Sequence, residues 1–369
     1  MSEQVLIINC RQDELTRERL GFHSALVRRG KVIVAPVRRV TDSWVELREG
    51  SSIPVSEVSA LLHLDPPDTS IPEGLPATHL PTVWVHMDGA TGVPWRSLWS
   101  RLFDVACVCG TDGAGFDEQG FYRLITQPYA ARREWFADET TARELDIGWA
   151  GSFEGAIYSK RRKLLPLLAA RYRMNDWQSK ISESKVASLY RRAKIVVNIQ
   201  RDDFPRLYNV RCFEAFAAGA LVCLEKPNDI ARAGFRDGIH YAGYHSDEEL
   251  FEIIDFFLAH ESARAAVAEA GQRLAKDQHT YDHRVAELLN VLGEVAQHKQ
   301  GGGVQMAQAE KSYLYCHYYS KHLELYSAGF HLKSLFQSAS PLTVPALAHC
   351  SRAAWHRWRS TPTPRLASA

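Results

Sequence analysis

The first third of the chain alternates short apolar runs with amphipathic segments. Between Val5 and about Gln127, helices are expected at 14–29 and 95–103, and the apolar runs VLIINC, VIVAPV, ALLHL, TVWVH, VACVCG and RLITQ are expected to be strands. Runs that are apolar on both faces and separated by helices are typical of a parallel sheet covered on both sides. The pattern therefore predicts an α/β domain over residues 1–145.

The same alternation starts again at residue 146. Ser246 and Glu249 have the spacing of a capping box at the start of a helix. The runs DIGWAG, KIVVNIQ and ALVCL are expected to be strands, and helices are expected at 158–172, 183–192, 249–260, 262–276 and 281–297, with one more that ends at Gly219. Residues 146–297 are thus predicted to form a second α/β domain, with a cleft between the two.

The last part of the chain has a different pattern. Three consecutive glycines at 301–303 mark a break, 304–337 is helical and aromatic in pattern, and 338–369 contains four prolines. From residue 298 onward there are eight basic and two acidic residues. This segment, 298–369, is predicted to be a basic extension, helical or loosely ordered, whose AAWHRWR cluster allows weak association with a membrane surface.

Composition narrows the classes of partner and location. The chain has 369 residues, of which 46% are hydrophobic and 24% charged, as in globular proteins. With 44 basic and 43 acidic residues the net charge is +1, so nucleic acid is not expected as a partner. The seven cysteines form no C-x-x-C motif and are expected to be reduced thiols. Without a leader or a long apolar run, the predicted location is cytoplasmic, with peripheral contact at the inner membrane face.

Several common motifs for cofactors and metals are absent from the sequence. The first strand is followed by INCRQDE rather than G-x-G-x-x-G, and there is no G-x-x-x-x-G-K-[ST] and no G-x-S-x-G. The histidines lack H-E-x-x-H spacing, and no Asp-x-Asp pair is present to carry a metal-bound nucleotide sugar. The sequence therefore predicts neither a cofactor nor a metal.

One candidate site for an anion follows the strand DIGWAG. The small residues Gly151 and Ser152 make a turn in which backbone N–H groups can approach an anion, and Lys160, Arg161 and Arg162 follow it. These residues favour binding of a diphosphate. The alternative is that the basic residues form a solvated helix end.

A second candidate site lies in the segment LYNVRCFEAFAAGALVCLE. Asn209, Arg211 and Glu214 stand inside a helix that is otherwise small or apolar. Because Arg211 and Glu214 are three residues apart, they share one face of the helix. Either the two pair with each other, or this face points into a ligand site.

Five segments, GSFEGAIYSKRRKLL, SKVASLYRRAKIVVNIQ, YNVRCFEAFAAGALVCLE, GIHYAGYHSDEEL and AKDQHTYDHRVAELL, carry a family resemblance. In order and spacing they resemble the C-terminal half of group 1 (family-4-like) glycosyltransferases, most closely the spore-maturation-like (CgeB-like) branch. The resemblance covers about 146–292. In the first half it is carried mainly by PTVWVHMDG and FDVACVCG.

The resemblance implies the GT-B fold, in which two Rossmann-like domains face each other across a cleft. The C-terminal domain would bind a nucleotide-diphosphate sugar and the N-terminal domain the acceptor. Glu214 matches the glutamate that accepts hydrogen bonds from the ribose, Arg211 and Asn209 match polar positions that face the donor, and Arg161 or Arg162 matches the arginine near the diphosphate. Arg206 stands where many group 1 enzymes have a further glutamate.

Candidates on the acceptor side come from the segment VWVHMDG. His86 and Asp88 lie at the carboxyl end of an expected strand, where ligands bind in open α/β sheets, and either could orient or deprotonate an acceptor hydroxyl. The alternative is a packed core histidine and a capping aspartate. The resemblance implies retention of configuration, in which the donor phosphate can take the place of a side-chain base.

The predicted function is transfer of a sugar from a nucleotide-diphosphate sugar to a glycan, lipid-linked or protein acceptor, without a metal. The resemblance places it in surface polysaccharide biosynthesis. Two alternatives remain at this point: a nucleotide-sugar epimerase of the same fold, which would need paired carboxylates and a histidine around the sugar, and a catalytically inactive scaffold.

Overall fold

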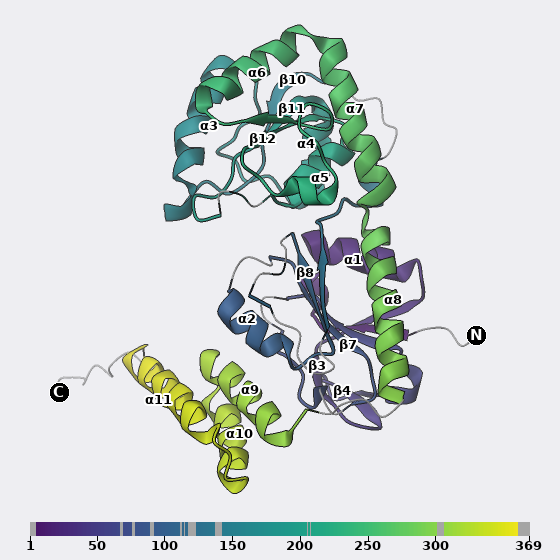
Figure 1. Ribbon diagram of the computed structural model, residues 1–369, viewed down its shortest axis with the longest axis vertical. Coiled ribbons are helices and arrows are strands. Elements are labelled where there is room, and N and C mark those ends of the chain that lie inside the picture. Colours follow the sequence, from purple (N-terminus) through teal and green to yellow (C-terminus); the bar gives the residue numbers. More distant parts are fainter. Residues whose placement is uncertain are drawn as a thin grey trace, which may run out of the picture.

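The computed structural model describes residues 5–66, 69–75, 78–88, 92–110, 113, 115–116, 123–136, 142–204, 206, 208–300 and 306–360. Figure 1 shows two α/β bodies stacked along the long axis, with the helices of the C-terminal segment beside the lower one. Both bodies contain a parallel sheet, so the predicted architecture of two α/β domains is confirmed.

The first sheet has six parallel strands in the order β2-β1-β6-β7-β8-β9. The strands are β1 (Val5–Ile8), β2 (Lys31–Val34), β6 (Ala60–His63), β7 (Thr82–His86), β8 (Val105–Cys109) and β9 (Arg123–Gln127), and the helices that accompany them are α1 (Arg17–Val27) and α2 (Val93–Ser100). A small antiparallel sheet was not predicted; it consists of β3 (Val37–Val40), β4 (Trp44–Leu47) and β5 (Ser52–Pro54). The central strands β6, β7 and β8 are buried along their whole length, as continuous apolar runs require.

The second sheet has four parallel strands in sequence order. The strands are β10 (Leu145–Gly148), β11 (Ala193–Asn198), β12 (Leu221–Glu225) and β13 (Ala242–Tyr244), and the helices are α3 (Ser159–Arg171), α4 (Glu183–Arg192), α5 (Val210–Ala217), α6 (Asp247–Ala259) and α7 (Glu261–Gln278). The Ser246 hydroxyl caps α6 by accepting the N–H of Glu249 at 3.1 Å. The N-cap half of the predicted capping box is therefore confirmed, while the Glu249 carboxylate accepts the N–H of His245 instead.

Helix α8 (Tyr281–Gln300) returns from the second domain to the first and lies along α1 (Figure 1). At its start, Asp282 makes a bidentate ion pair with Arg28 of α1, with N–O distances of 2.9 and 2.8 Å. At its end, the ammonium group of Lys299 lies 2.7 Å from the buried Asp104 carboxylate. Helix α8, predicted to belong to the second domain, thus packs on the first. The domain boundaries at residues 145 and 297 stay predictions.

The described part of the extension, 306–360, forms the helices α9 (Gln308–Lys321), α10 (Leu325–Gln337) and α11 (Thr343–Ser360). Helix α9 packs against the first domain, where the Tyr318 hydroxyl accepts the N–H of Ile71 at 3.1 Å and the Tyr319 hydroxyl donates to Glu73 at 2.7 Å. The helical extension is thus confirmed over these residues. None of the helices described in the structure is long and apolar enough to cross a membrane.

The Lys299–Asp104 ion pair gives a test of how α8 is fixed to the first domain. We expect Lys299→Met to lower the free energy of unfolding by about 3 kcal/mol, because Asp104 would stay buried without its cation. Lys299 also donates to the carbonyls of Thr78 and Leu80, both at 2.9 Å. Urea unfolding measures the change, with the exposed Lys276→Met as control. A loss below about 0.5 kcal/mol would contradict the anchoring role.

Candidate functional site

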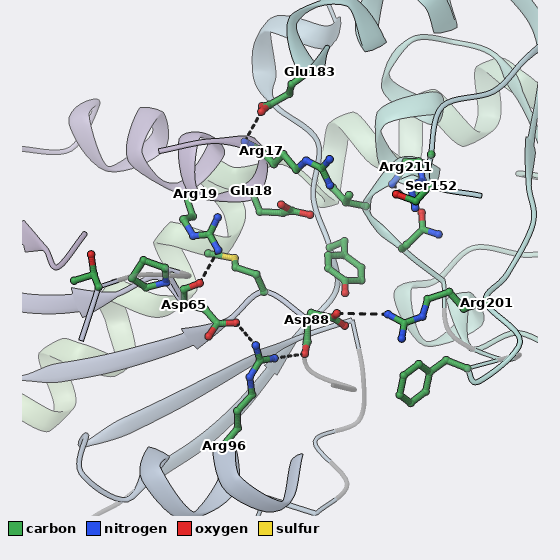
Figure 2. A pocket seen from close by; sticks show the side chains of 18 of the residues that line it. Arg17, Glu18, Arg19, Asp65, Asp88, Arg96, Ser152, Glu183, Arg201 and Arg211 are labelled. Carbon is green, nitrogen blue, oxygen red and sulfur yellow. Dashed lines mark hydrogen bonds and ion pairs between the residues drawn. The ribbon is translucent and has the colours of Figure 1, made fainter. Parts of the chain in front are cut away.

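A cleft of about 810 Å³ lies between the two domains. Figure 2 shows charged side chains that reach into it from both walls. Its lining includes Arg19, Asp65, Trp84, Asp88 and Arg96 from the first domain, Gly151, Ser152, Arg161, Arg201, Asn209, Arg211 and Glu214 from the second, and Tyr318, His322 and Glu324 from the extension. The structure therefore brings together seven of the ten predicted site residues.

The first turn of α5 carries the central group on the second-domain wall. Asn209 caps the helix, because its Oδ1 accepts the N–H of Arg211 at 3.0 Å. Its Nδ2 donates to Asn198 at the end of β11, at 2.9 Å. The cap ties the start of α5 to the carboxyl end of a strand, so the polar face of the helix opens into the cleft while Phe213 and Phe216 are buried behind it.

Arg211 and Glu214 share this face but do not form an ion pair. Among the described residues, neither side chain has an ion-pair or hydrogen-bond partner for its charged group. Arg211 instead lies over Gly151, where an added Cβ would be 3.2 Å from Nη1 and 3.0 Å from the Trp149 ring. The alternative in which the two residues merely pair with each other is therefore wrong for this structure.

The Glu214 carboxyl has an unusual acidity. Burial raises its pKa to about 7, the charge of Glu18 across the cleft adds to the rise, and Arg211 and Arg132 oppose it. A carboxyl group of this kind changes charge near neutral pH, and such groups cluster at functional sites. Glu214 can therefore accept hydrogen bonds as a carboxylate above pH 7 and is partly protonated below it.

Arg161 is buried behind the turn that follows β10. Its Nη1 donates to the carbonyl of Ser152 at 2.7 Å, its Nε donates to the carbonyl of Ile199 at 3.0 Å, and its guanidinium lies 4.5 Å from the centre of the Tyr158 ring. Burial lowers the pKa of Arg161 to about 10, with the nearby charge of Arg211 adding to the effect. The residue therefore fixes the Gly151–Ser152 turn and adds positive charge to the same wall.

Lys160 and Arg162 do not line the cleft. The Lys160 ammonium group pairs with Glu225, and the Arg162 guanidinium donates to the carbonyl groups of Phe153, at 3.2 Å, and Gly155. The N-terminus of α3 is capped by Asp202, whose carboxylate accepts the N–H of Ser159 at 2.7 Å. For these two basic residues the structure agrees with the alternative of a helix end outside the site.

His86 and Asp88 have different environments. His86 is fully buried, its Nε2 is 2.7 Å from the Ser100 hydroxyl, and burial holds its pKa well below the usual value. It is a packed core histidine and does not line the cleft. Asp88 does line it, and its carboxylate is 3.8 Å from Arg201 of the second domain (Figure 2).

Asp65, Arg96 and Arg201 are among the charged residues of the cleft that were not predicted. Asp65 forms an ion pair with Arg96 at 2.9 Å, and Arg96 also donates to the backbone carbonyl of Asp88 at 2.6 Å. Burial raises the pKa of Asp65, although Arg96 opposes the shift. Arg201 is held by two bonds to Asp203 at 2.9 and 2.7 Å. Asp65 follows the apolar run ALLHL, so the rule that ligands bind beyond strand ends could have found it.

The extension also contributes to the first-domain wall. The buried Tyr318 ring packs edge-on against Trp99, with centroids 4.9 Å apart, and His322 lies 4.6 Å from Tyr318. No group of three or more histidine, cysteine, aspartate or glutamate side chains in the described ranges is arranged to hold a metal ion.

Comparisons with known proteins identify the second domain. Residues 132–290 match a family model described as glycosyl transferase-like. No curated protein matches the chain. Anabaena HepE, solved in complex with UDP and glucose, is similar at 10% identity and a TM-score of 0.50 over 78% of this chain and 100% of its own. A glycosyltransferase from Rickettsia africae ESF-5 is similar at 9% identity and a TM-score of 0.53, over 80% and 99%.

The structural similarity confirms the predicted GT-B fold. The family match confirms the predicted enzyme class. The chain thus has the GT-B fold, and its residues 132–290 form a glycosyl transferase-like domain.

Proposed function

We propose that the protein transfers a sugar from a nucleoside-diphosphate sugar to a hydroxyl group of a glycan, lipid-linked or protein acceptor. The donor would bind the second-domain wall of the cleft. HepE was solved with UDP and glucose, which makes a UDP-sugar the first donor to test. The finer expectations, the CgeB-like branch, surface polysaccharide biosynthesis, a cytoplasmic location and contact with a membrane, are part of this proposal.

The observation that carries the proposal is the open polar face at the start of α5. Arg211 and Glu214 both face the cleft without an ion pair or hydrogen bond to their charged groups among the described residues, and charged groups at a pocket wall that lack such contacts cost free energy unless a ligand meets them. A ribose offers two hydroxyl donors to a carboxylate such as Glu214, and a diphosphate offers oxygens to a guanidinium such as Arg211.

The proposed reaction needs electrostatic stabilisation on this wall. The acceptor oxygen forms a bond to the anomeric carbon while the carbon–oxygen bond to the diphosphate breaks, and the bonding electrons leave with the diphosphate. Arg211 and the charge of Arg161 would stabilise the departing anion. We propose retention of configuration, with the acceptor proton passing to the leaving phosphate oxygen, and transfer without a metal, because the sequence has no Asp-x-Asp pair.

The acceptor would bind the first-domain wall. Asp88 is the remaining sequence-predicted candidate there, since it lines the cleft and its side chain is 46% exposed. We propose that it orients the acceptor hydroxyl. The ion pair between Asp65 and Arg96 would hold Asp88 in place through the backbone bond from Arg96.

Donor binding can be measured by thermal shift and calorimetry with UDP-, GDP- and ADP-sugars in the absence of metal. A donor at a hundredfold excess over its dissociation constant should stabilise the wild type by about 2.7 kcal/mol. Arg211→Ala should lower turnover by about two to three decades, because the leaving group loses its cation. Lys276→Ala, an exposed lysine of α7, serves as control. If no nucleotide sugar stabilises the wild type, the donor assignment is wrong.

Donor affinity should also depend on pH through Glu214, whose pKa is about 7. Ribose hydroxyls donate to the ionised carboxylate, so binding weakens as pH falls through 7, by about tenfold between pH 8 and 6. UDP-glucose is the suitable probe, because the terminal phosphate of UDP itself titrates in this range. Glu214→Gln should bind more weakly and lose the pH dependence. A wild-type profile that is flat between pH 6 and 8 would argue against contact with the ribose.

Gly151 offers a test of the contact beneath Arg211. In Gly151→Ala the new Cβ would lie 3.2 Å from the guanidinium and 3.0 Å from Trp149, so Arg211 must shift. We expect UDP-glucose binding to weaken by about tenfold, the cost of a misplaced charged hydrogen bond, with little change in melting temperature. Gly293→Ala is the matched control, because nothing lies within 4 Å of its added Cβ. If both variants bind UDP-glucose equally well, Arg211 does not contribute to donor binding.

A further inference from the structure

A second hollow, of about 410 Å³, lies between the first domain and the extension. The first domain contributes Arg39 of β3 and the Glu73–Gly74 turn, and the extension contributes residues of α9 and α10, among them Lys311, Phe330 and Lys333. None of the residues that line this hollow lines the cleft. It is therefore a separate site.

The hollow carries a net positive charge. Arg39, Lys311 and Lys333 all line it, and within the described ranges none of the three has an ion-pair partner. Its single carboxylate, Glu73, is already engaged, because it accepts hydrogen bonds from the Tyr319 hydroxyl at 2.7 Å and from His331 at 3.1 Å. The three cations therefore remain available to a ligand.

The half-buried position of Lys311 makes its positive charge unfavourable for the folded state. Lys311 is half-buried on α9, and burial lowers its pKa, although Glu73 opposes the shift. Partial removal of an ammonium group from water raises the free energy of the folded state. An anion in the hollow would offset that cost by charge-assisted hydrogen bonds.

The apolar surroundings restrict the ligand further. Phe330 lines the hollow and is 67% exposed, and Phe336 on the same helix is 58% exposed. An anionic group attached to an apolar group would contact both the cations and Phe330. A small phosphorylated molecule would contact the cations alone. The chemistry common to both is a phosphate group.

We propose that the hollow between the first domain and helices α9 and α10 binds a phosphate group, held by Arg39, Lys311 and Lys333. The group belongs either to a small soluble molecule or to the headgroup of an anionic lipid. This site lies outside the donor cleft and does not depend on the proposed transfer reaction.

The test uses the full chain and two probes. Inorganic phosphate is titrated by calorimetry in a buffer without other multivalent anions, and flotation is measured with vesicles of phosphatidylcholine alone or with about a third phosphatidylglycerol. We expect Lys311→Gln combined with Arg39→Gln to weaken binding by about tenfold or more, since two charge-assisted bonds are lost. The control, Lys276→Gln combined with Lys185→Gln, removes the same charge from exposed positions elsewhere.

The outcomes separate the sources of the phosphate. Binding of inorganic phosphate that the double variant loses supports a soluble ligand. Flotation only with the anionic vesicles, lost in the double variant and in Phe330→Ser, supports a lipid headgroup. Absence of binding to either probe, or equal binding by the double variant and its control, overturns the proposal. If the double variant has a lowered melting temperature, the exposed Lys333→Gln replaces it, and UDP-glucose affinity serves as the measure of an intact cleft.

Discussion

The geometry of the cleft depends on one buried guanidinium, that of Arg284. It donates to the carbonyl groups of Pro128 at 2.8 Å and Tyr129 at 3.2 Å, on the segment that leaves the first domain, and to that of Gln278 at 3.1 Å, on the segment that returns. Burial lowers its pKa, so the cation is held only because several carbonyl oxygens surround it. The backbone N–H of Ala131 adds a bond to His279 at 2.8 Å. The two chain segments that connect the domains are therefore bonded to each other.

Other polar contacts set how the two walls face each other. Glu183 of α4 accepts the backbone N–H of Arg17, at the start of α1, at 2.7 Å and pairs with Arg132. On the opposite side of the cleft, Arg201 approaches Asp88. Charges that cross between the domains are thus largely compensated. Arg211 and Glu214 differ from these residues because they form no ion pair in the part of the chain that the structure describes. A charged residue with a purely structural role is normally paired, so the absence of a pair points to a ligand site.

The sequence predicted the two parallel sheets because their strands are continuous apolar runs, whereas β3, with the sequence VRRV, gave no such signal. It predicted the face that carries Arg211 and Glu214 from their spacing of three. It could not resolve Lys160, Arg161 and Arg162, because successive helical residues point about 100° apart and tertiary packing decides which one faces inward. For His86 at the end of β7, too, tertiary packing decides whether the side chain faces the cleft or the core. The contacts of Arg96 with Asp65 and of Arg201 with Asp88 join positions that are distant in sequence, so no local pattern marked them.

Helix α9 belongs to both ligand sites, since Lys311 and Tyr315 line the hollow and Tyr318 lines the cleft, one turn further along. A ligand in one site can alter affinity at the other only if this helix has two arrangements that the ligand distinguishes. The hydroxyls of Tyr315 and Tyr318 are bonded to the backbone of Pro72 and Ile71, and both rings are buried. Because α9 is fixed at both Tyr315 and Tyr318, occupation of the hollow should leave donor affinity unchanged. The extension would then act as a rigid wall that the two sites share.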